Sequence, residues 1–197
     1  LCCLVLATTC RADHQKFEYT SSYSQRPVSA VADIYGVTNS PHISGRLHFQ
    51  QPTAGGPVIV RGTIKGLTPG LHGLHIHEIG NLTDDCKAAG PHFNPFSKNH
   101  GAQDSDERHV GDLGNIEAFD IDHPFTVAEL YLVDFLISLS AESERGVLHR
   151  SVVVHEKADD LGLTEGEDSK KTGNSGSRVA CGIITLITSS HRSSSPY

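Results

Sequence analysis

The sequence predicts a single all-β domain, an antiparallel sandwich or barrel, and three observations lead to this prediction. The chain of 197 residues has the size of one domain. Its 19 glycines punctuate short segments in which apolar and polar residues alternate with the period of a strand. Two long polar stretches, residues 80–114 and 156–178, lack any period. Such loops inside a compact domain are usually functional, so we expect the site there.

The strands are clearest in the first half of the domain. Apolar residues at alternate positions mark the first one: Val28, Ala30, Ala32 and Ile34. Because successive side chains of a strand point to opposite faces, these residues line one face. Turns and strands then follow in order: a turn at 36–44, a strand at 45–50, a turn cluster at 52–57, a strand at 58–65 and a turn at 67–70. A later strand is formed by three consecutive valines at 152–154.

The two ends of the chain differ from the domain. Residues 1–12, LCCLVLATTCRA, read as the back half of a secretory signal peptide; a buried strand or a membrane anchor is the alternative, but the stretch is too short to span a bilayer. Residues 13–27 read as a flexible polar lead-in, residues 28–188 as the domain, and residues 189–197 as a serine-rich tail. Three of the five cysteines lie in the leader, so cleavage would leave Cys86 and Cys181, an even number suited to an oxidising compartment.

Composition excludes some functions and favours another. The formal net charge is −7, from 16 basic and 23 acidic residues, which argues against a general nucleic-acid binder. No apolar run reaches the roughly 18–20 residues of a membrane span. The 13 histidines instead favour a metal site.

The histidine spacing indicates two metal sites. His75 and His77 stand two apart, so on a strand they share one face while Leu74 and Ile76 share the other. Alone, this pair is also compatible with core histidines. Further candidate ligands follow at His92, His100, His109, Asp112 and His155. Four imidazoles suit copper(II), and three imidazoles with a carboxylate suit tetrahedral zinc. Two four-coordinate sites have eight ligand positions, so seven ligands fill them only if one imidazolate bridges both ions. The spacing does not say which histidine is the bridge.

Five segments together resemble the copper/zinc superoxide dismutase family over residues 28–187. They are GLHIHEIG at 73–80, GPHFNP at 90–95, RHVGDLG at 108–114, VHEKADD at 154–160 and GNSGSRVACG at 173–182. The resemblance implies an eight-stranded antiparallel Greek-key β-barrel or sandwich with two long functional loops. It also implies dismutation of superoxide, an antioxidant reaction, at a copper ion that alternates between Cu(II) and Cu(I) beside a structural zinc ion.

The resemblance also implies roles for individual residues. Copper would be held by His75, His77, His92 and His155. Zinc would be held by His92, His100, His109 and Asp112, so His92 would be the bridge and would also transfer a proton. Asp159 would join His75 to His100, and His72 would be structural. Cys86 and Cys181 would form a disulfide, and Arg178 would dock the anionic substrate. The channel would be shaped by Lys171, Thr172, Glu167 and Asp168.

Two other function classes are compatible with the fold that the resemblance implies. A non-enzymatic secreted metal-binding domain would have lost a copper histidine or Arg178, and this chain retains them all. A copper-delivery chaperone would add a metal-capturing cysteine motif, whereas the chain without its leader has two cysteines.

Two departures from the family pattern and one modification site complete the expectations. Between Gly114 and Val154 the chain is about six residues longer than the usual pattern, near residues 121–130, IDHPFTVAEL, which replace a tight turn that normally carries glycine; the segment is either a genuine insertion or an error in the gene model. His149 stands where the family usually has glycine, near its dimer contact, which bears on whether a homodimer forms. Asn81 begins an Asn-Leu-Thr triplet, so we expect a secreted protein with a glycan on Asn81. The remaining histidines are expected to be surface or packing residues: His14, His42, His48, His123, His149 and His191.

Overall fold

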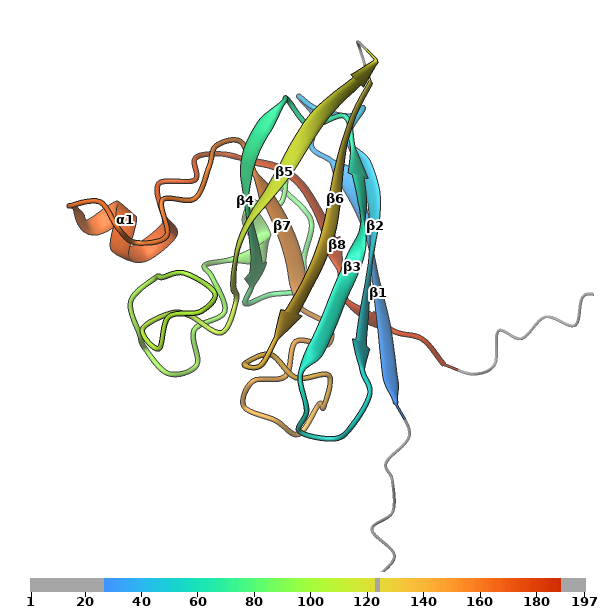
Figure 1. The fold of residues 1–197 in the computed structure, drawn as a ribbon, viewed down its shortest axis with the longest axis vertical. Coiled ribbons are helices and arrows are strands. Elements are labelled where there is room, and N and C mark those ends of the chain that lie inside the picture. Colours follow the sequence, from blue (N-terminus) through green and yellow to red (C-terminus); the bar gives the residue numbers. More distant parts are fainter. Residues whose placement is uncertain (1–26, 123–124, 189–197) are drawn as a thin grey trace, which may run out of the picture.

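A computed structural model describes residues 27–122 and 125–188 (Figure 1). Its strands are β1 (Val28–Gly36), β2 (Ser44–Gln51), β3 (Val58–Lys65), β4 (Gly70–His77), β5 (Asp112–Asp122), β6 (Phe125–Asp134), β7 (Ser151–His155), β8 (Arg178–Ile183) and β9 (Thr185–Leu186). A 3₁₀ turn, η1 (Lys87–Ala89), and a short helix, α1 (Glu167–Thr172), lie in the two long loops. The leader at 1–12, residues 13–26 of the lead-in and the tail at 189–197 lie outside the described residues.

The strands form a closed antiparallel barrel, as expected. They follow the order β2-β3-β6-β5-β4-β7-β8-β1, and β1 also pairs with β2, which closes the sheet. The short β9 adds to β1. Strand β3 pairs with β6 and β4 with β7, so the connections skip neighbouring strands in the Greek-key manner. The predicted strands at 28–34, 45–50, 58–65 and 152–154 are confirmed.

The barrel interior is filled by the apolar residues that the alternation placed on one face. Ala30 and Ala32 are 0% exposed and Ile34 is 1% exposed, and all three belong to the main core. Leu74 and Ile76 of β4 lie in the same core. The other face of β4 is buried as well, because His75 and His77 are covered rather than solvated. An imidazole pair on the outer face of a barrel is buried only if loops cover it.

Those covering loops are the two long polar stretches. Residues 78–111 connect β4 to β5, and residues 156–177 connect β7 to β8. In Figure 1 the first loop and α1 lie side by side on one flank of the barrel. The backbone N–H of His100 donates to the carbonyl of Lys170 at 2.8 Å, which joins the loops directly. The helix α1 was not predicted, because six residues are too few to display a helical period.

The long segment at 121–130 extends a hairpin. It belongs to the ends of β5 and β6, whose pairing includes Phe119 with Val127 and Asp120 with Thr126 before a register shift. The structure therefore places residues 121–122 and 125–130 of this segment in strands. Within the described part of the chain, no helix is both long and apolar enough to cross a bilayer.

Candidate metal centre

Four buried histidines from three parts of the chain converge beside β4. They are His75 and His77 on β4, His92 in the loop after β4, and His155 at the end of β7. One ring nitrogen of each lies within 4.8 Å of the others. The Nε2 atoms of His77 and His155 are 3.3 Å apart. We call this group the four-histidine cluster.

A second group shares His92 with the first. It contains His92, His100, His109 and Asp112, and all four are buried. The Oδ1 atom of Asp112 lies 2.9 Å from Nδ1 of His92, 3.0 Å from Nδ1 of His100 and 3.1 Å from Nδ1 of His109. Tetrahedral zinc, with Zn–N bonds of about 2.0–2.1 Å, requires its ligand atoms to be roughly 3.3 Å apart. These spacings suit a single ion, and we call the group the histidine–aspartate cluster.

Buried nitrogens without a hydrogen-bond partner fit metal ligation. They are Nδ1 of His75, Nε2 of His92 and Nδ1 of His100. Buried polar atoms normally have a partner, because desolvating one without compensation is costly. His92 directs its Nδ1 toward Asp112 and leaves Nε2 for the four-histidine cluster. A bridging imidazolate needs both ring nitrogens, so the geometry favours His92 for that position.

Burial keeps the four-histidine cluster neutral. It lowers the pKa of His75 and His77 well below the usual value and that of His155 to about 4, since desolvation penalises the charged ring. The pKa of His92 is also lowered, mainly by burial. Neutral imidazole is the form that binds a metal ion.

The histidine–aspartate cluster attracts positive charge. Burial alone would lower the pKa of His100, but the carboxylates of Asp112 and Asp159 outweigh it and raise the pKa to about 9. Burial would raise the pKa of Asp112, yet the neighbouring imidazoles of His100, His109 and His92 hold it well below its usual range. A buried, ionised carboxylate ringed by imidazoles is a favourable place for a cation.

Asp159 connects the two clusters, as the resemblance implied. Its Oδ2 accepts from Nε2 of His75 at 2.9 Å, and its Oδ1 accepts from Nε2 of His100 at 2.7 Å. Sequence reasoning missed two residues that hold it there. Asn115 bonds both sides of the Asp159 backbone, at 2.7 and 2.9 Å, and Gly173 gives the carboxylate room. Their link to Asp159 spans many residues, so no local pattern shows it.

Arg178 is tied to the loop that carries the disulfide. Cys86 and Cys181 form the expected bond across a separation of 95 residues. The Nη1 group of Arg178 donates to the carbonyl of Cys86 at 2.5 Å, and its Nη2 group donates to the carbonyl of Gly90 at 2.5 Å. Gly90 also accepts from Nδ1 of His77 at 2.8 Å. The disulfide loop therefore sets the position of Arg178 relative to the four-histidine cluster.

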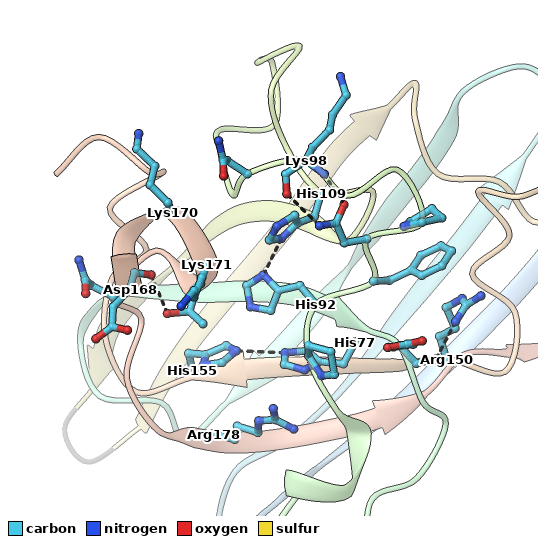
Figure 2. A pocket seen from close by; sticks show the side chains of 18 of the residues that line it. His77, His92, Lys98, His109, Arg150, His155, Asp168, Lys170, Lys171 and Arg178 are labelled. Carbon is cyan, nitrogen blue, oxygen red and sulfur yellow. Dashed lines mark hydrogen bonds between the residues drawn. The ribbon is translucent and has the colours of Figure 1, made fainter. Parts of the chain in front are cut away.

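A cavity of about 980 Å³ opens onto the clusters (Figure 2). Its lining includes His77, His92, His109 and His155, together with Arg178. Three of the four expected channel residues also line it: Asp168, Lys171 and Thr172. Glu167 does not line it, but its carboxylate pairs with the ammonium of Lys171 at 2.7 Å. Lys98, Arg150 and Lys170 line the cavity as well and were not indicated by the sequence.

The other histidines are accounted for. His72 is buried, with Nδ1 at 2.8 Å from the carbonyl oxygen of His155 and Nε2 at 2.8 Å from that of Thr68, so it is structural. His42, His48 and His149 are exposed, as expected. The rest lie outside the described residues: His14, His123 and His191.

Fold and clusters together define a metalloprotein with two adjacent, histidine-rich metal sites on a Greek-key barrel. Comparison with known proteins narrows this class. The profile of the copper/zinc superoxide dismutase family matches residues 43–184, so the chain belongs to that family.

Similar proteins come from distant organisms. The chain is 46% identical to copper–zinc superoxide dismutase 5 of Dictyostelium discoideum over 81% of this chain and 98% of that protein. It is 49% identical to copper–zinc superoxide dismutase 2 of Mesembryanthemum crystallinum, over 82% and 97%. It is 44% identical to the extracellular copper–zinc superoxide dismutase of Drosophila melanogaster, over 81% and 86%. Copper and zinc are the cofactors of this family, and the two clusters fit them.

Proposed function

We propose that this enzyme converts two superoxide anions and two protons into dioxygen and hydrogen peroxide at the paired clusters. The observation that carries this proposal is the sharing of His92 between the four-histidine and the histidine–aspartate clusters. His75, His77, His92 and His155 would hold copper, and His92, His100, His109 and Asp112 would hold zinc. Copper, when bound, supplies one-electron chemistry in both directions, while zinc orders the loop.

The protein's own groups would handle the anion and a proton. Arg178 uses three N–H groups on the carbonyls of Cys86, Lys87 and Gly90, which leaves Nε–H and one Nη2–H for the substrate. A guanidinium both attracts and orients a small anion. His92 would carry one proton on Nε2 toward the anion while Nδ1 stays beside Asp112. Water in the open cavity would supply the second proton.

The activity is tested on protein loaded with both metals. We expect about one copper and one zinc ion per chain by elemental analysis and rapid superoxide loss by pulse radiolysis. Arg178→Glu should slow that loss by roughly 10- to 10³-fold while both metals stay bound. Lys65→Glu, on the exposed outer side of β3, is the matched charge change away from the cavity. A fully loaded protein without activity contradicts the function; equal rates for both variants contradict the role of Arg178.

We also propose that the protein is secreted and carries a glycan on Asn81. The signal-like residues 1–12 and the similarity to one extracellular enzyme support secretion. Asn81 and Thr83 are exposed, and the Thr83 hydroxyl donates to Oδ1 of Asn81 at 2.8 Å. Intact-mass analysis of protein from culture medium should show a glycan that Asn81→Gln removes. Recovery of the unmodified protein only inside cells would contradict this proposal.

We further propose a homodimer through the face around Ile79. Ile79 is 49% exposed, and the neighbouring Gly80 packs against His149 and Ile183. The support for this proposal is an exposed apolar side chain close to His149, the position that the resemblance places near the dimer contact of the family. Sedimentation velocity of the metal-loaded protein should give a dimer that Ile79→Lys dissociates. A monomer at every concentration tested would contradict it.

A further inference from the structure

Arg150 lies where three segments of the four-histidine cluster meet. It directly precedes β7, the strand that ends in His155. The register of β4 with β7 pairs His77 with Ser151, which places Arg150 beside the end of β4. On its other edge, β4 is bridged to the loop that follows it, because His77 also pairs with His92. Figure 2 shows Arg150 on the side of His77 that faces away from His155.

The guanidinium of Arg150 crosses the end of β4 to reach this loop. Its Nε group donates to the carbonyl of Gly146 at 2.8 Å, and its Nη1 group donates to the carbonyl of Glu78 at 2.6 Å. Its Cζ atom lies 3.5 Å from the centroid of the Phe93 ring, within the range over which the face of an aromatic ring attracts a cation. One side chain therefore contacts three separate segments of the chain.

Two of these contacts are made with the immediate neighbours of candidate copper ligands. Glu78 follows His77, and Phe93 follows His92. The N–H of Phe93 donates to the carbonyl of Ile76 at 2.9 Å, and its side chain is buried, so the residue is firmly packed. A displacement at either contact would therefore change the spacing between the two histidines.

Arginine suits this position through its shape as well as its charge. A guanidinium is planar and holds its donors in fixed directions, so it can bond two carbonyls while it lies on a ring. A lysine ammonium is a compact point charge and cannot cover the same three partners at once. The backbone of Arg150 is anchored separately, because its carbonyl accepts from the N–H of Ile184 at 2.9 Å. Replacing the side chain leaves that bond intact.

We propose that Arg150 is a positioning residue that holds His77 and His92 at the spacing that copper requires. This inference rests on the proposed function, in which the four-histidine cluster binds copper. The histidine–aspartate cluster is held instead by bonds to Asp112 and Asp159. Loss of the Arg150 side chain should therefore weaken copper binding more than zinc binding.

The test compares Arg150→Met and Arg150→Lys with the parent protein. Methionine removes the donors and the charge, whereas lysine keeps the charge and removes the planar fork. Copper affinity, measured by titration of the zinc-bound protein against a competing chelator, should fall roughly 10-fold or more in both variants. The EPR spectrum of bound Cu(II) should shift in both, because it reports the arrangement of the nitrogen ligands. Zinc content should equal that of the parent.

Arg145→Met is the matched control. Arg145 lies in the same connection between β6 and β7, and its Nη1 group donates to the carbonyl of Phe135 at 3.4 Å. Unlike Arg150, it does not line the cavity. The control removes the same charge and should leave both the copper affinity and the EPR spectrum unchanged.

The outcomes separate positioning from stability, charge and function. Copper affinity and spectra in both Arg150 variants that match Arg145→Met would overturn the proposal, even if urea unfolding showed a less stable protein. A defect in Arg150→Met that Arg150→Lys fully repairs would assign the effect to charge and overturn it too. If Arg150→Met does not fold, Arg150→Lys decides alone. A metal-loaded parent that does not consume superoxide refutes the proposed function, whereas the copper-binding comparison does not depend on activity.

Discussion

Gly173→Ala is expected to disconnect the two metal clusters, and the structure allows the size of the effect to be estimated. Gly173 has a φ of 65°, and a Cβ there would overlap Oδ1 of Asp159 and lie 2.5 Å from Nε2 of His100. A non-glycine residue in this left-handed conformation costs roughly 1–2 kcal/mol. The Asp159 carboxylate must also move, which breaks its bond to His100.

The second contribution comes from that hydrogen bond. A bond to a charged, buried group contributes about 1.5–3 kcal/mol. Together with the backbone cost, Gly173→Ala should lower the free energy of unfolding of the metal-free protein by about 3–4 kcal/mol. Zinc affinity should fall roughly 10- to 100-fold, as is typical when a group that orients a ligand is lost.

A matched glycine isolates the contact from the backbone effect. Gly55 has a φ of 71°, close to that of Gly173, but a Cβ there would have no atom within 4 Å. Gly55→Ala should therefore cost only about 1–2 kcal/mol and leave zinc affinity unchanged. Urea unfolding of metal-free protein and zinc titration against a competing chelator measure both quantities. Equal unfolding energies and equal zinc affinities for the two variants would refute the reasoning.

Three further variants test other parts of the structure. Asp112→Ala should abolish zinc retention before copper is affected, whereas Asp106→Ala, which removes an exposed acid of the loop before β5, should retain both metals. Elemental analysis decides, and equal zinc contents of the two variants would contradict the assignment. Asp134→Ala removes the buried partner of Arg108, to which the guanidinium bonds at 2.9 and 2.7 Å. The free energy of unfolding in urea should fall by about 3–5 kcal/mol. A fall below about 1 kcal/mol would mean that water replaces the partner. His149 has a φ of 63°, in the left-handed region that favours glycine. His149→Gly should therefore stabilise the protein by about 1 kcal/mol or less, measured as a rise in the unfolding midpoint. A lower midpoint would show that the backbone at this position stores no strain.

Local pattern was enough to predict β1, β2, β3 and β7 of the barrel, whereas β5, β6, β8 and β9 were not individually predicted. Alternating residues such as Ala30, Ala32 and Ile34 can bury one face only as a strand, so their period predicts both the structure and the face. The same reasoning placed His75 and His77 together opposite Leu74 and Ile76, and the structure confirms it. Boundaries were less exact: β5 begins at Asp112, inside the stretch expected to be a loop.

Seven candidate ligands could be found in the sequence because copper and zinc need imidazole and carboxylate ligands, and this sequence offers them. Their division into two clusters could not be derived from spacing. It depends on which nitrogen of each ring faces which neighbour, and that is fixed by contacts such as His92 Nδ1 with Asp112, twenty residues apart. The motif resemblance supplied the division, and the buried nitrogens without partners give it a physical basis in this chain.

The sequence by itself determined the clearly alternating strands, their buried faces and the residue types of the metal centre, because these depend on local period and on side-chain chemistry. Only the tertiary structure decided the roles of Asn115 and Gly173. Asn115 reaches Asp159 across 44 residues, and α1 is joined to the loop after β4 by the bond between the His100 N–H and the Lys170 carbonyl. Hydrogen bonds and electric fields act through space, so residues distant in the chain acquire a function only when the barrel brings their loops together.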